Sequence, residues 1–179
     1  HCILLSGPSG SGKTSVAMIL QTKLECSSND FKDINCADFR GIEMVRDIRR
    51  DMTMRPIAGP CRIWLIDECH RLSQDAQNAF LKMLEDTPSH VYFILSMTEP
   101  QRLIKPIHTR STEIKFNALS VKLLTQLIQD VLKKEGKELS EEVVDRIVEN
   151  CDGSARKALV LLDQVIEIEE EDDQLNAVM

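Results

Sequence analysis

The chain has 179 residues and a formal net charge of −7 at pH 7, and 42% of its residues are hydrophobic. This length fits one α/β domain with a small appendage, and the hydrophobic content is ample for a core. The negative charge excludes a general binder of polyanions, so any contact with nucleic acid has to come from a local basic patch.

The cysteines indicate the compartment. Six are present without any C-x-x-C pair, and most lie inside apolar runs, as expected of buried thiols in a reducing, intracellular compartment. That compartment would be the nucleus of a eukaryote, or the cytoplasm or nucleoid for a bacterial or phage-associated protein. No signal peptide, long apolar span or lipidation signal is present, so we expect no membrane partner. Because His1 opens directly into strand residues, we expect a fragment that lacks its upstream part.

The first elements expected are a buried strand at 2–5, a glycine-rich loop and a buried helix that starts near Lys13. The loop fits the phosphate-binding pattern G-x-x-x-x-G-K-[ST] at every fixed position, with the residues Gly7, Pro8, Ser9, Gly10, Ser11, Gly12, Lys13 and Thr14. Its glycines allow backbone N–H groups to turn inward, and the helix N-terminus adds positive partial charge there. Lys13 would reach the β- and γ-phosphates of ATP, and the Thr14 hydroxyl would bind Mg²⁺. The alternative is a Gly/Ser-rich turn that matches the pattern by chance.

Further strands and helices alternate along the chain. We expect a short strand at 31–36, a helix at 41–54, and a strand at 62–66 that is buried on both faces and ends in Asp67 and Glu68. A helix capped by Ser73 follows, and strands at 91–95 and 112–116 complete the pattern. Strands alternating with helices predict the α/β class, with a doubly wound parallel sheet of five strands.

Beyond Asn117 the pattern contains helices only. Three helices are expected at 120–134, 140–150 and 154–168, and each begins at a serine that can cap it. The acidic run from Glu167 onward is expected to be a solvated or disordered end. The predicted organisation is therefore a nucleotide-binding core at 1–117, a three-helix domain at 118–168 and an acidic tail at 169–179.

Acidic and hydroxyl side chains at the strand ends suit hydrolysis of a phosphoanhydride. That reaction needs a second contact to Mg²⁺ and a group that orients the attacking water. Asp67 is the expected Mg²⁺ contact and Glu68 the water-polarising base, unless both are simply solvated acids at a strand end. Thr98, at the tip of the next strand, is placed to sense the γ-phosphate, although a threonine there is more often a turn former.

The order of these motifs resembles that of the AAA+ clamp-loader ATPases, including the replication factor C small subunits and the gamma/tau subunit of bacterial DNA polymerase III. The matching segments are GPSGSGKT at 7–14, NCADFRGI at 35–42, LIDECH at 65–70, AQNAFL at 76–81, FILSMT at 93–98 and PIHTRS at 106–111. The resemblance covers nearly the whole chain. It implies a P-loop AAA+ core with residues 118–168 as a helical lid, ATP and Mg²⁺ as cofactors, and hydrolysis of ATP to ADP and phosphate.

The resemblance also assigns roles to single residues. The family has a Ser-Arg-Cys motif where this chain has Thr109-Arg110-Ser111, which makes Arg110 an arginine finger that acts in trans on the neighbouring subunit's ATP. It makes Arg156, at the start of a lid helix, the contact in cis to the γ-phosphate. Asn35 lies where many AAA+ proteins hold the catalytic glutamate inactive. Ordinary surface arginines are the alternative for Arg110 and Arg156.

The partners that the resemblance implies are neighbouring AAA+ subunits of a ring or spiral, a sliding clamp and primer-template DNA. Arg40 and Arg46 match the family's basic positions at the start of the helix that contacts DNA, although the acidic residues interleaved with them also suit an ordinary mixed-charge helix face. The zinc module of the bacterial branch needs four clustered cysteines, and only Cys26 is near that position, so we predict no structural zinc. The adenine-binding segment and C-terminal collar of the family are not in this sequence, so weak nucleotide binding and no self-assembly are expected of it.

Three other classes of protein remain as alternatives. Asp67-Glu68-Cys69-His70 followed by Ser96-Met97-Thr98 resembles helicase motifs, but the residues after Asn117 offer no second set of strands. Another AAA+ machine, such as a Holliday-junction branch-migration motor or a replication-linked recombination ATPase, is closer. A structural loader subunit that hydrolyses ATP weakly or not at all is the third, and Lys13, Thr14, Asp67 and Glu68 argue against it.

Overall fold

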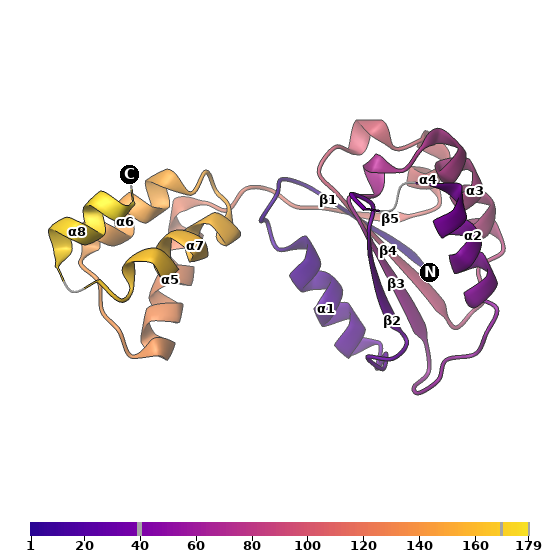
Figure 1. Ribbon diagram of the computed structural model, residues 1–179, viewed down its shortest axis with the longest axis horizontal. Helices are drawn as coiled ribbons and strands as arrows, with labels where there is room; N and C mark the ends of the chain where they lie inside the picture. Colours follow the sequence, from indigo (N-terminus) through magenta and orange to yellow (C-terminus); the bar gives the residue numbers. More distant parts are fainter. Residues whose placement is uncertain (39–40, 169, 179) are drawn as a thin grey trace. The chain divides into compact units, whose positions relative to one another are not determined.

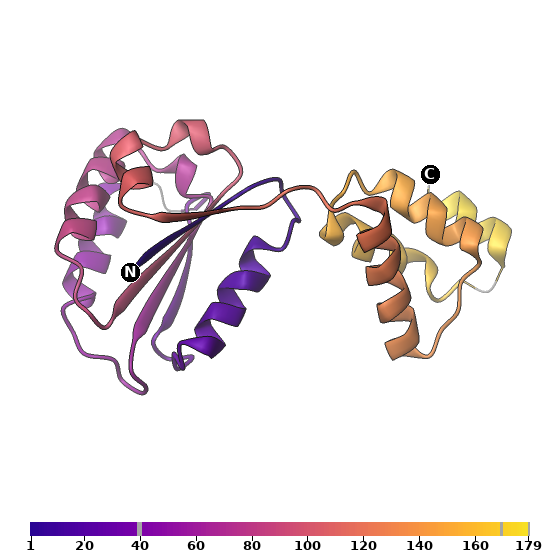
Figure 2. The ribbon, with the colours of Figure 1, turned by 180° about the vertical axis from the view of Figure 1, so that it is seen from behind.

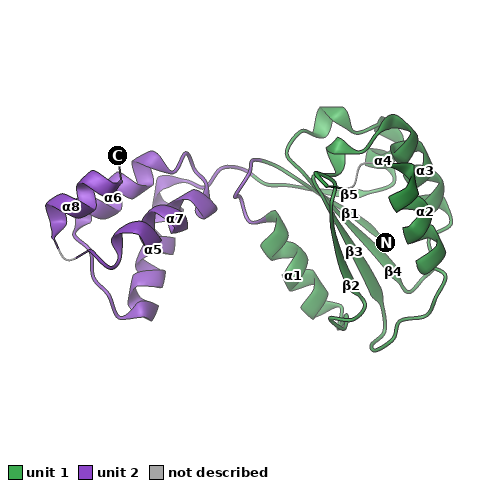
Figure 3. Cartoon of the chain, viewed as in Figure 1, with its two compact units in different colours: residues 1–7, 13–116 green, residues 8–12, 117–179 purple. Residues whose placement is uncertain are grey.

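The computed structural model describes residues 1–38, 41–168 and 170–178. Two compact units make up the chain, as Figure 3 shows by colour. The first unit contains residues 1–7 and 13–116, and the second contains residues 8–12 and 117–179. The middle of the glycine-rich loop is thus grouped with the helical unit, while both of its ends belong to the sheet unit.

The first unit is built on a five-stranded parallel sheet with the strand order β2-β3-β4-β1-β5 (Figure 1). The strands are β1 Cys2–Ser6, β2 Phe31–Asn35, β3 Arg62–Asp67, β4 Val91–Met97 and β5 Thr112–Lys115. Continuous apolar runs form β1, β3 and β4, because these strands are covered on both faces. The predicted α/β class and five-stranded parallel sheet are confirmed.

Helices cover both faces of this sheet, as Figures 1 and 2 show from opposite sides. Helix α1 (Lys13–Lys23) lies on one face, and α2 (Ile42–Asp51), α3 (Gln74–Glu85) and α4 (Lys105–Thr109) lie on the other. Two short 3-10 turns, η1 (Cys69–Arg71) and η2 (Pro100–Arg102), follow β3 and β4. A separate apolar cluster fills each face, with Leu5, Ala17, Ile63 and Ile94 under α1 and Val45, Trp64, Phe80, Phe93 and Ile107 on the far side.

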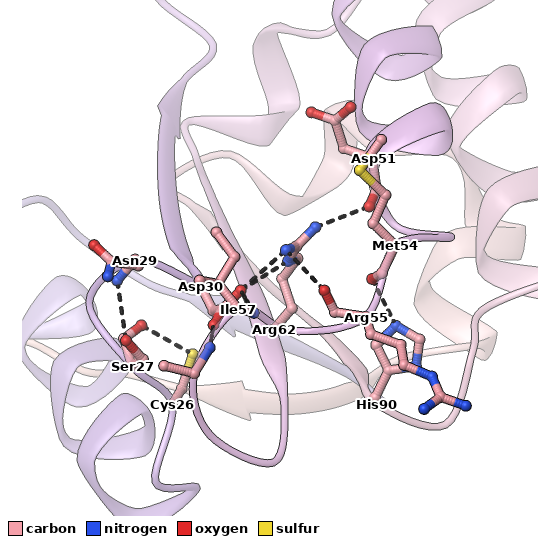
Figure 4. A network of polar contacts seen from close by, with 11 residues as sticks. Cys26, Ser27, Asn29, Asp30, Asp51, Met54, Arg55, Ile57, Arg62 and His90 are labelled. Carbon is pink, nitrogen blue, oxygen red and sulfur yellow. Dashed lines mark hydrogen bonds and ion pairs between the residues drawn. The ribbon is translucent and has the colours of Figure 1, made fainter.

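Helix α2 ends earlier than the sequence predicts. A helix was expected to about residue 54, whereas α2 ends at Asp51. At this end the Arg62 guanidinium donates from Nη1 to the Asp51 carbonyl at 2.9 Å and from Nη2 to the Arg55 carbonyl at 3.2 Å (Figure 4). The Asp51 carbonyl also accepts the backbone N–H of Met54 at 3.1 Å, so the chain closes into a tighter turn in place of a further helical turn.

The second unit consists of α5 (Val121–Glu135), α6 (Glu141–Asn150), α7 (Ala155–Val165) and α8 (Glu171–Ala177). Ser120, Ser140 and Ser154 cap the first three helices, as their sequence positions predicted, by accepting hydrogen bonds from backbone N–H groups three residues on. The core of the unit contains Leu124, Ile128, Val143, Ile147, Ala158 and Leu162.

The acidic tail differs from the expectation of a solvated or disordered end. Residues 171–177 form helix α8, which packs against α6 and α7. Gln174 and Val178 are buried, and the Gln174 side chain donates to the Ile168 carbonyl at 2.5 Å. The acidic residues occupy the first turn of α8, where the helix dipole favours negative charge. The prediction from charge density alone, a solvated or disordered end, was therefore wrong for residues 171–177.

All six cysteines are buried and free, in keeping with the interpretation of the sequence. Within the described residues, no helix has the length and apolar character that crossing a membrane requires.

Candidate nucleotide-binding site

The carboxyl ends of the strands bring several of the predicted site residues to one edge of the sheet. Asn35 is aligned with Asp67, and Ser6 with Met97, so that the segments following β1, β2, β3 and β4 leave the sheet at the same level. Gly7 and Thr98 come directly after two of these strands. In an open parallel α/β sheet, ligands bind at this edge.

The first end of the glycine-rich loop is fixed tightly to the sheet. Gly7 donates its backbone N–H to the Met97 carbonyl at 3.2 Å, and a Cβ at Gly7 would lie 2.4 Å from the Phe116 carbonyl oxygen. Only glycine fits there. Lys13, which opens α1, is buried and donates from Nζ to the Gly7 carbonyl at 2.9 Å. The lysine is thereby folded back over the loop, as a phosphate-binding lysine requires.

The centre of the loop is fixed by the start of α7, within the second unit. Gly10 has a φ of +73°, and a Cβ on it would lie 2.0 Å from Ser154 Oγ. The backbone N–H of Arg156 donates to the Gly10 carbonyl at 3.4 Å. The structure thus brings Arg156 beside the loop that is predicted to hold phosphates. The buried Ser11 hydroxyl has no hydrogen-bond partner in the described part of the chain, which is compatible with a phosphate oxygen as its acceptor.

Asp67 and Glu68 follow the central strand β3. The backbone N–H of Glu68 donates to Asp67 Oδ1 at 3.0 Å, and Glu68 has left-handed angles, φ 53° and ψ 37°. A non-glycine residue in this conformation is uncommon, and such strain concentrates at functional sites. Thr98 Oγ1 donates to Glu68 Oε2 at 3.4 Å. The structure therefore brings Glu68 and Thr98 together, while their roles in hydrolysis stay predictions.

The donor set suits Mg²⁺ bound together with a nucleotide. Magnesium is usually held by one or two protein oxygens, with phosphate oxygens and water as its other ligands. The Asp67 carboxylate and the Thr14 hydroxyl, in the first turn of α1, are oxygen donors of this kind. Among the described residues, no group of three or more His, Cys, Asp and Glu side chains is arranged to hold a metal ion by itself. A bound magnesium would supply charge neutralisation for the phosphates at this edge.

His70 is the site residue that reasoning from sequence did not identify. It lies in η1, its side chain is 2% exposed, and its Nε2 is 3.4 Å from both Glu68 Oε2 and Glu99 Oε1. The segment Asp67-Glu68-Cys69-His70 resembles motifs of both clamp loaders and helicases, but neither resemblance assigns a role to its histidine. A histidine two residues after a proposed catalytic glutamate can contact it when a short turn follows the strand.

Within the described residues, Arg110 has no hydrogen bond or ion pair with Asp67 or Glu68 of its own chain. It follows the short helix α4, where its Nη2 pairs with Glu85 Oε1 at 2.7 Å and its Nη1 donates to the Pro106 carbonyl at 3.3 Å. Glu85 is the last residue of α3 and was not anticipated as a partner. The Arg110 side chain is 40% exposed, so a second chain has access to it.

The remaining predicted residues have no hydrogen bond or ion pair with Glu68 in the described ranges of the chain. The Asn35 side chain accepts from the Ala37 backbone N–H at 2.8 Å. Arg46 lies on the exposed face of α2 and forms an ion pair with Glu43. Arg40 lies outside the described residues.

Comparison with known proteins gives the chain sequence relatives. A family model described as DNA polymerase III, delta subunit, matches residues 38–120. The chain is 32% identical to DNA polymerase III subunit gamma of Buchnera aphidicola subsp. Schizaphis graminum, over 94% of this chain and 52% of that protein. It is 33% identical to subunit tau of Bacillus subtilis, over 93% of this chain and 33% of that protein. The chain thus spans between a third and about half of the length of these relatives.

Solved structures share the fold. The Thermotoga maritima RuvB Holliday junction branch migration motor superposes with a TM-score of 0.80 at 21% identity, over 99% of this chain and 60% of that one. A variant of the same motor gives the same TM-score at 20% identity. At 20–21% identity these structures show only a shared fold, which is that of the AAA+ proteins. The chain is thus similar in sequence to the gamma and tau subunits of DNA polymerase III, and similar in fold to the RuvB motor.

Proposed function

We propose that the chain is the ATP-binding and ATP-hydrolysing module of a DNA sliding-clamp loader subunit, coupling ATP to the loading of a clamp on primed DNA. The observation that favours this function most is the 32–33% identity to DNA polymerase III subunits gamma and tau over at least 93% of the chain. The arrangement of Lys13, Glu68 and Thr98 supports hydrolysis rather than binding alone.

In this proposal each side chain at the sheet edge has one task. Lys13 and the backbone N–H groups of the loop bind the β- and γ-phosphates, and Thr14 and Asp67 bind Mg²⁺. Glu68 orients and polarises the attacking water, and Thr98 holds Glu68 and contacts the γ-phosphate. Arg156 contacts the γ-phosphate from α7, which its backbone contact with Gly10 supports.

A neighbouring subunit completes the working site. We propose that Arg110 enters the ATP site of the next subunit, because its contacts lie with Glu85 and Pro106 rather than with Glu68 of its own chain. Arginines in such positions stabilise the charge on the phosphoryl group in the transition state of its transfer, and this raises kcat by about 10³ to 10⁵. Primer-template DNA would contact Arg46 and Arg40, and Asn35 would restrain Glu68 until DNA is bound.

Two other functions fit less well. A branch-migration motor is favoured only by the structural likeness to RuvB, and at 20–21% identity that likeness extends to the fold alone. A structural loader subunit would not need the contact between Thr98 and Glu68, which is useful only if water has to be activated.

The ATPase rate of the full-length protein with its co-purifying subunits tests the proposal. The rate is measured with and without the clamp and primed DNA, for wild type and for the variants Lys13→Ala and Arg110→Ala. We expect stimulation by clamp and primed DNA together, and loss of the stimulated rate in both variants. Stimulation that survives both substitutions, or stimulation by four-way junction DNA in place of primed DNA, would refute the proposal.

A further inference from the structure

His70 contacts the proposed catalytic glutamate from a fully enclosed position. Its turn, η1, starts directly after Glu68 and packs against η2, the turn that follows Thr98. The His70 side chain is 2% exposed, while that of Glu68 is 27% exposed. The histidine is therefore a fixed element behind a carboxylate that still faces solvent.

The groups around His70 indicate which ring nitrogen carries the proton. Nε2 faces two carboxylate oxygens, Glu68 Oε2 and Glu99 Oε1, both at 3.4 Å, and such acceptors require an N–H donor. Nδ1 is buried, and it has no hydrogen-bond partner within the described residues. A proton on Nδ1 would be an unsatisfied buried donor, so the surroundings favour a proton on Nε2.

The contacts of Glu68 are concentrated on one of its two oxygens. Oε2 accepts from Thr98 Oγ1 at 3.4 Å, lies 3.4 Å from His70 Nε2, and lies 4.0 Å from Arg71 Nε. In the described part of the chain, no hydrogen bond or ion pair reaches Oε1. Donors on Oε2 fix the plane of the carboxylate and leave Oε1 available for a water molecule.

We propose that His70 is a positioning residue for ATP hydrolysis, which holds Glu68 through the Nε2–H so that Oε1 faces the attacking water. The inference rests on the proposed ATPase function and adds a residue to it. His70 does not touch the nucleotide and acts through Glu68. A general base has to be within hydrogen-bonding reach of the water in a defined orientation, so loss of this contact lowers the rate of the chemical step rather than nucleotide affinity.

Glu99 offers the competing, purely structural explanation. It forms an ion pair with Arg102 Nε at 2.9 Å and faces the same nitrogen of His70, so in this explanation the histidine serves only to join η1 to η2. In the catalytic explanation the contact of His70 with Glu68 is the important one, and in the structural explanation it is the contact with Glu99. Glu99→Gln removes the charge of the structural partner and leaves Glu68 intact, so it is a matched control for substitutions of His70.

The test compares His70→Gln, His70→Asn, His70→Met and Glu99→Gln in the full-length protein with its co-purifying subunits. Glutamine places an N–H close to the position of His Nε2, whereas asparagine is too short and methionine has no donor. We expect His70→Gln and Glu99→Gln to keep kcat within about threefold of wild type, and His70→Asn and His70→Met to lose about 10- to 100-fold. KM for ATP and the Kd of a fluorescent ATP analogue should change less than about threefold in all four variants.

Several results would overturn the inference. It is wrong if His70→Asn and His70→Met retain at least half of the wild-type kcat, if Glu99→Gln loses as much as they do, or if KM and Kd rise in proportion to the loss. Thermal unfolding identifies a variant that fails to fold, and the other of His70→Asn and His70→Met then decides. If wild type hydrolyses ATP no faster than Lys13→Ala, the proposed function itself fails and this inference fails with it, whereas an active wild type with unaffected His70 variants refutes the inference alone.

Discussion

Arg62 donates from Nε and Nη2 to a single carboxylate oxygen of Asp30, at 3.2 and 3.0 Å, and both side chains are buried (Figure 4). The same carboxylate accepts the backbone N–H groups of Ile57 and Ala58, at 2.9 and 2.8 Å. The pair therefore fastens the loop between α2 and β3 to the start of β2. Arg62 also donates from Nη1 to the carbonyl of Asp51, the last residue of α2, and so ties the end of that helix to the same network.

Substitution of Asp30 should destabilise the protein strongly. Asp30→Asn leaves the guanidinium of Arg62 buried without a counter-charge, and breaking a buried pair in this way costs about 3–5 kcal/mol. Asp47→Asn is the matched control, since Asp47 pairs with Arg50 at 3.0 Å on the exposed surface, where a pair contributes less than about 1 kcal/mol. Urea unfolding monitored by circular dichroism gives both values. Equal losses would show that the buried pair is not a main source of stability.

The same carboxylate makes stability sensitive to acid. Burial alone would raise the pKa of Asp30, but the N–H groups of Ala58 and Ile57 and the charge of Arg62 outweigh it, so the pKa lies below its usual value of 3.8. The unfolded state then binds the proton more readily, so this contribution is complete above about pH 4 and is lost as the pH falls through the lowered pKa. We expect the urea midpoint of wild type to fall below pH 4 more steeply than that of Asp30→Asn.

Much of the fold and part of the site follow from the sequence, because their signals are local. The glycine-rich loop, the apolar strands and the serine caps are each defined by a few adjacent residues, and the structure has them at the predicted places. Family resemblance then singled out Arg110 and Arg156, whose roles remain predictions.

The contacts that escaped prediction join residues far apart in the sequence. Asp30 and Arg62 are 32 residues apart, and Arg110 and Glu85 are 25 apart, so no periodic pattern relates them. His70 is part of the D-E-x-H segment, but its contact with Glu68 depends on the left-handed turn at Glu68, which no local rule predicts. Helix α8 was missed for another reason, since its acidic residues suggested a solvated tail and its few buried contacts gave no periodic signal.

The buried thiols should resist alkylation in the native state. Burial raises the pKa of Cys2 and of Cys26 to about 11, and burial near the Asp67 and Glu68 carboxylates raises that of Cys36 to about 12. The thiolate is the reactive form, and at pH 8 a thiol with a pKa near 11 is ionised to only about one part in a thousand. We expect iodoacetamide to label these residues at pH 8 only after denaturation, as measured by mass spectrometry of peptides. Native labelling as fast as in urea would contradict this.

Alkaline pH should destabilise the fold through these same thiols. Their pKa values lie above the ordinary 9.0, so between about pH 9 and pH 11 the folded state binds more protons than the unfolded state. Stability is therefore complete below about pH 9 and declines as the pH rises through the raised values. Urea midpoints at pH 8, 9 and 10 should fall in that order, and a midpoint that rises over this range would refute the assignment.

Substitutions at the sheet edge should separate nucleotide binding from hydrolysis. Glu68→Gln keeps the size of the side chain and removes the base, so kcat should fall by about 10² to 10⁴ while the Kd for an ATP analogue changes little. Lys13→Ala should instead weaken binding itself, since its Nζ is held at the loop. Fluorescence titration and steady-state ATPase assays on the same preparations check both. Parallel losses of binding in the two variants would mean that Glu68 is not a base.

The pairing of Arg110 with Glu85 predicts how readily the arginine is released to a neighbouring site. The pair is partly exposed on both sides, so its net contribution is below about 1 kcal/mol, and a triphosphate with Mg²⁺ should displace Glu85 easily. Glu85→Gln should therefore change the stimulated ATPase rate by less than about threefold, whereas Arg110→Lys should lower it by at least about tenfold, because lysine lacks the planar fork of donors.

Mixing Arg110→Ala subunits with Lys13→Ala subunits tests whether Arg110 acts in trans. If it does, activity returns only at interfaces where a site with an intact Lys13 meets a neighbour with an intact Arg110. Equal loss in Glu85→Gln and Arg110→Lys would show instead that the ion pair supports the local fold, and no recovery on mixing assembled subunits would place the arginine's action in its own chain.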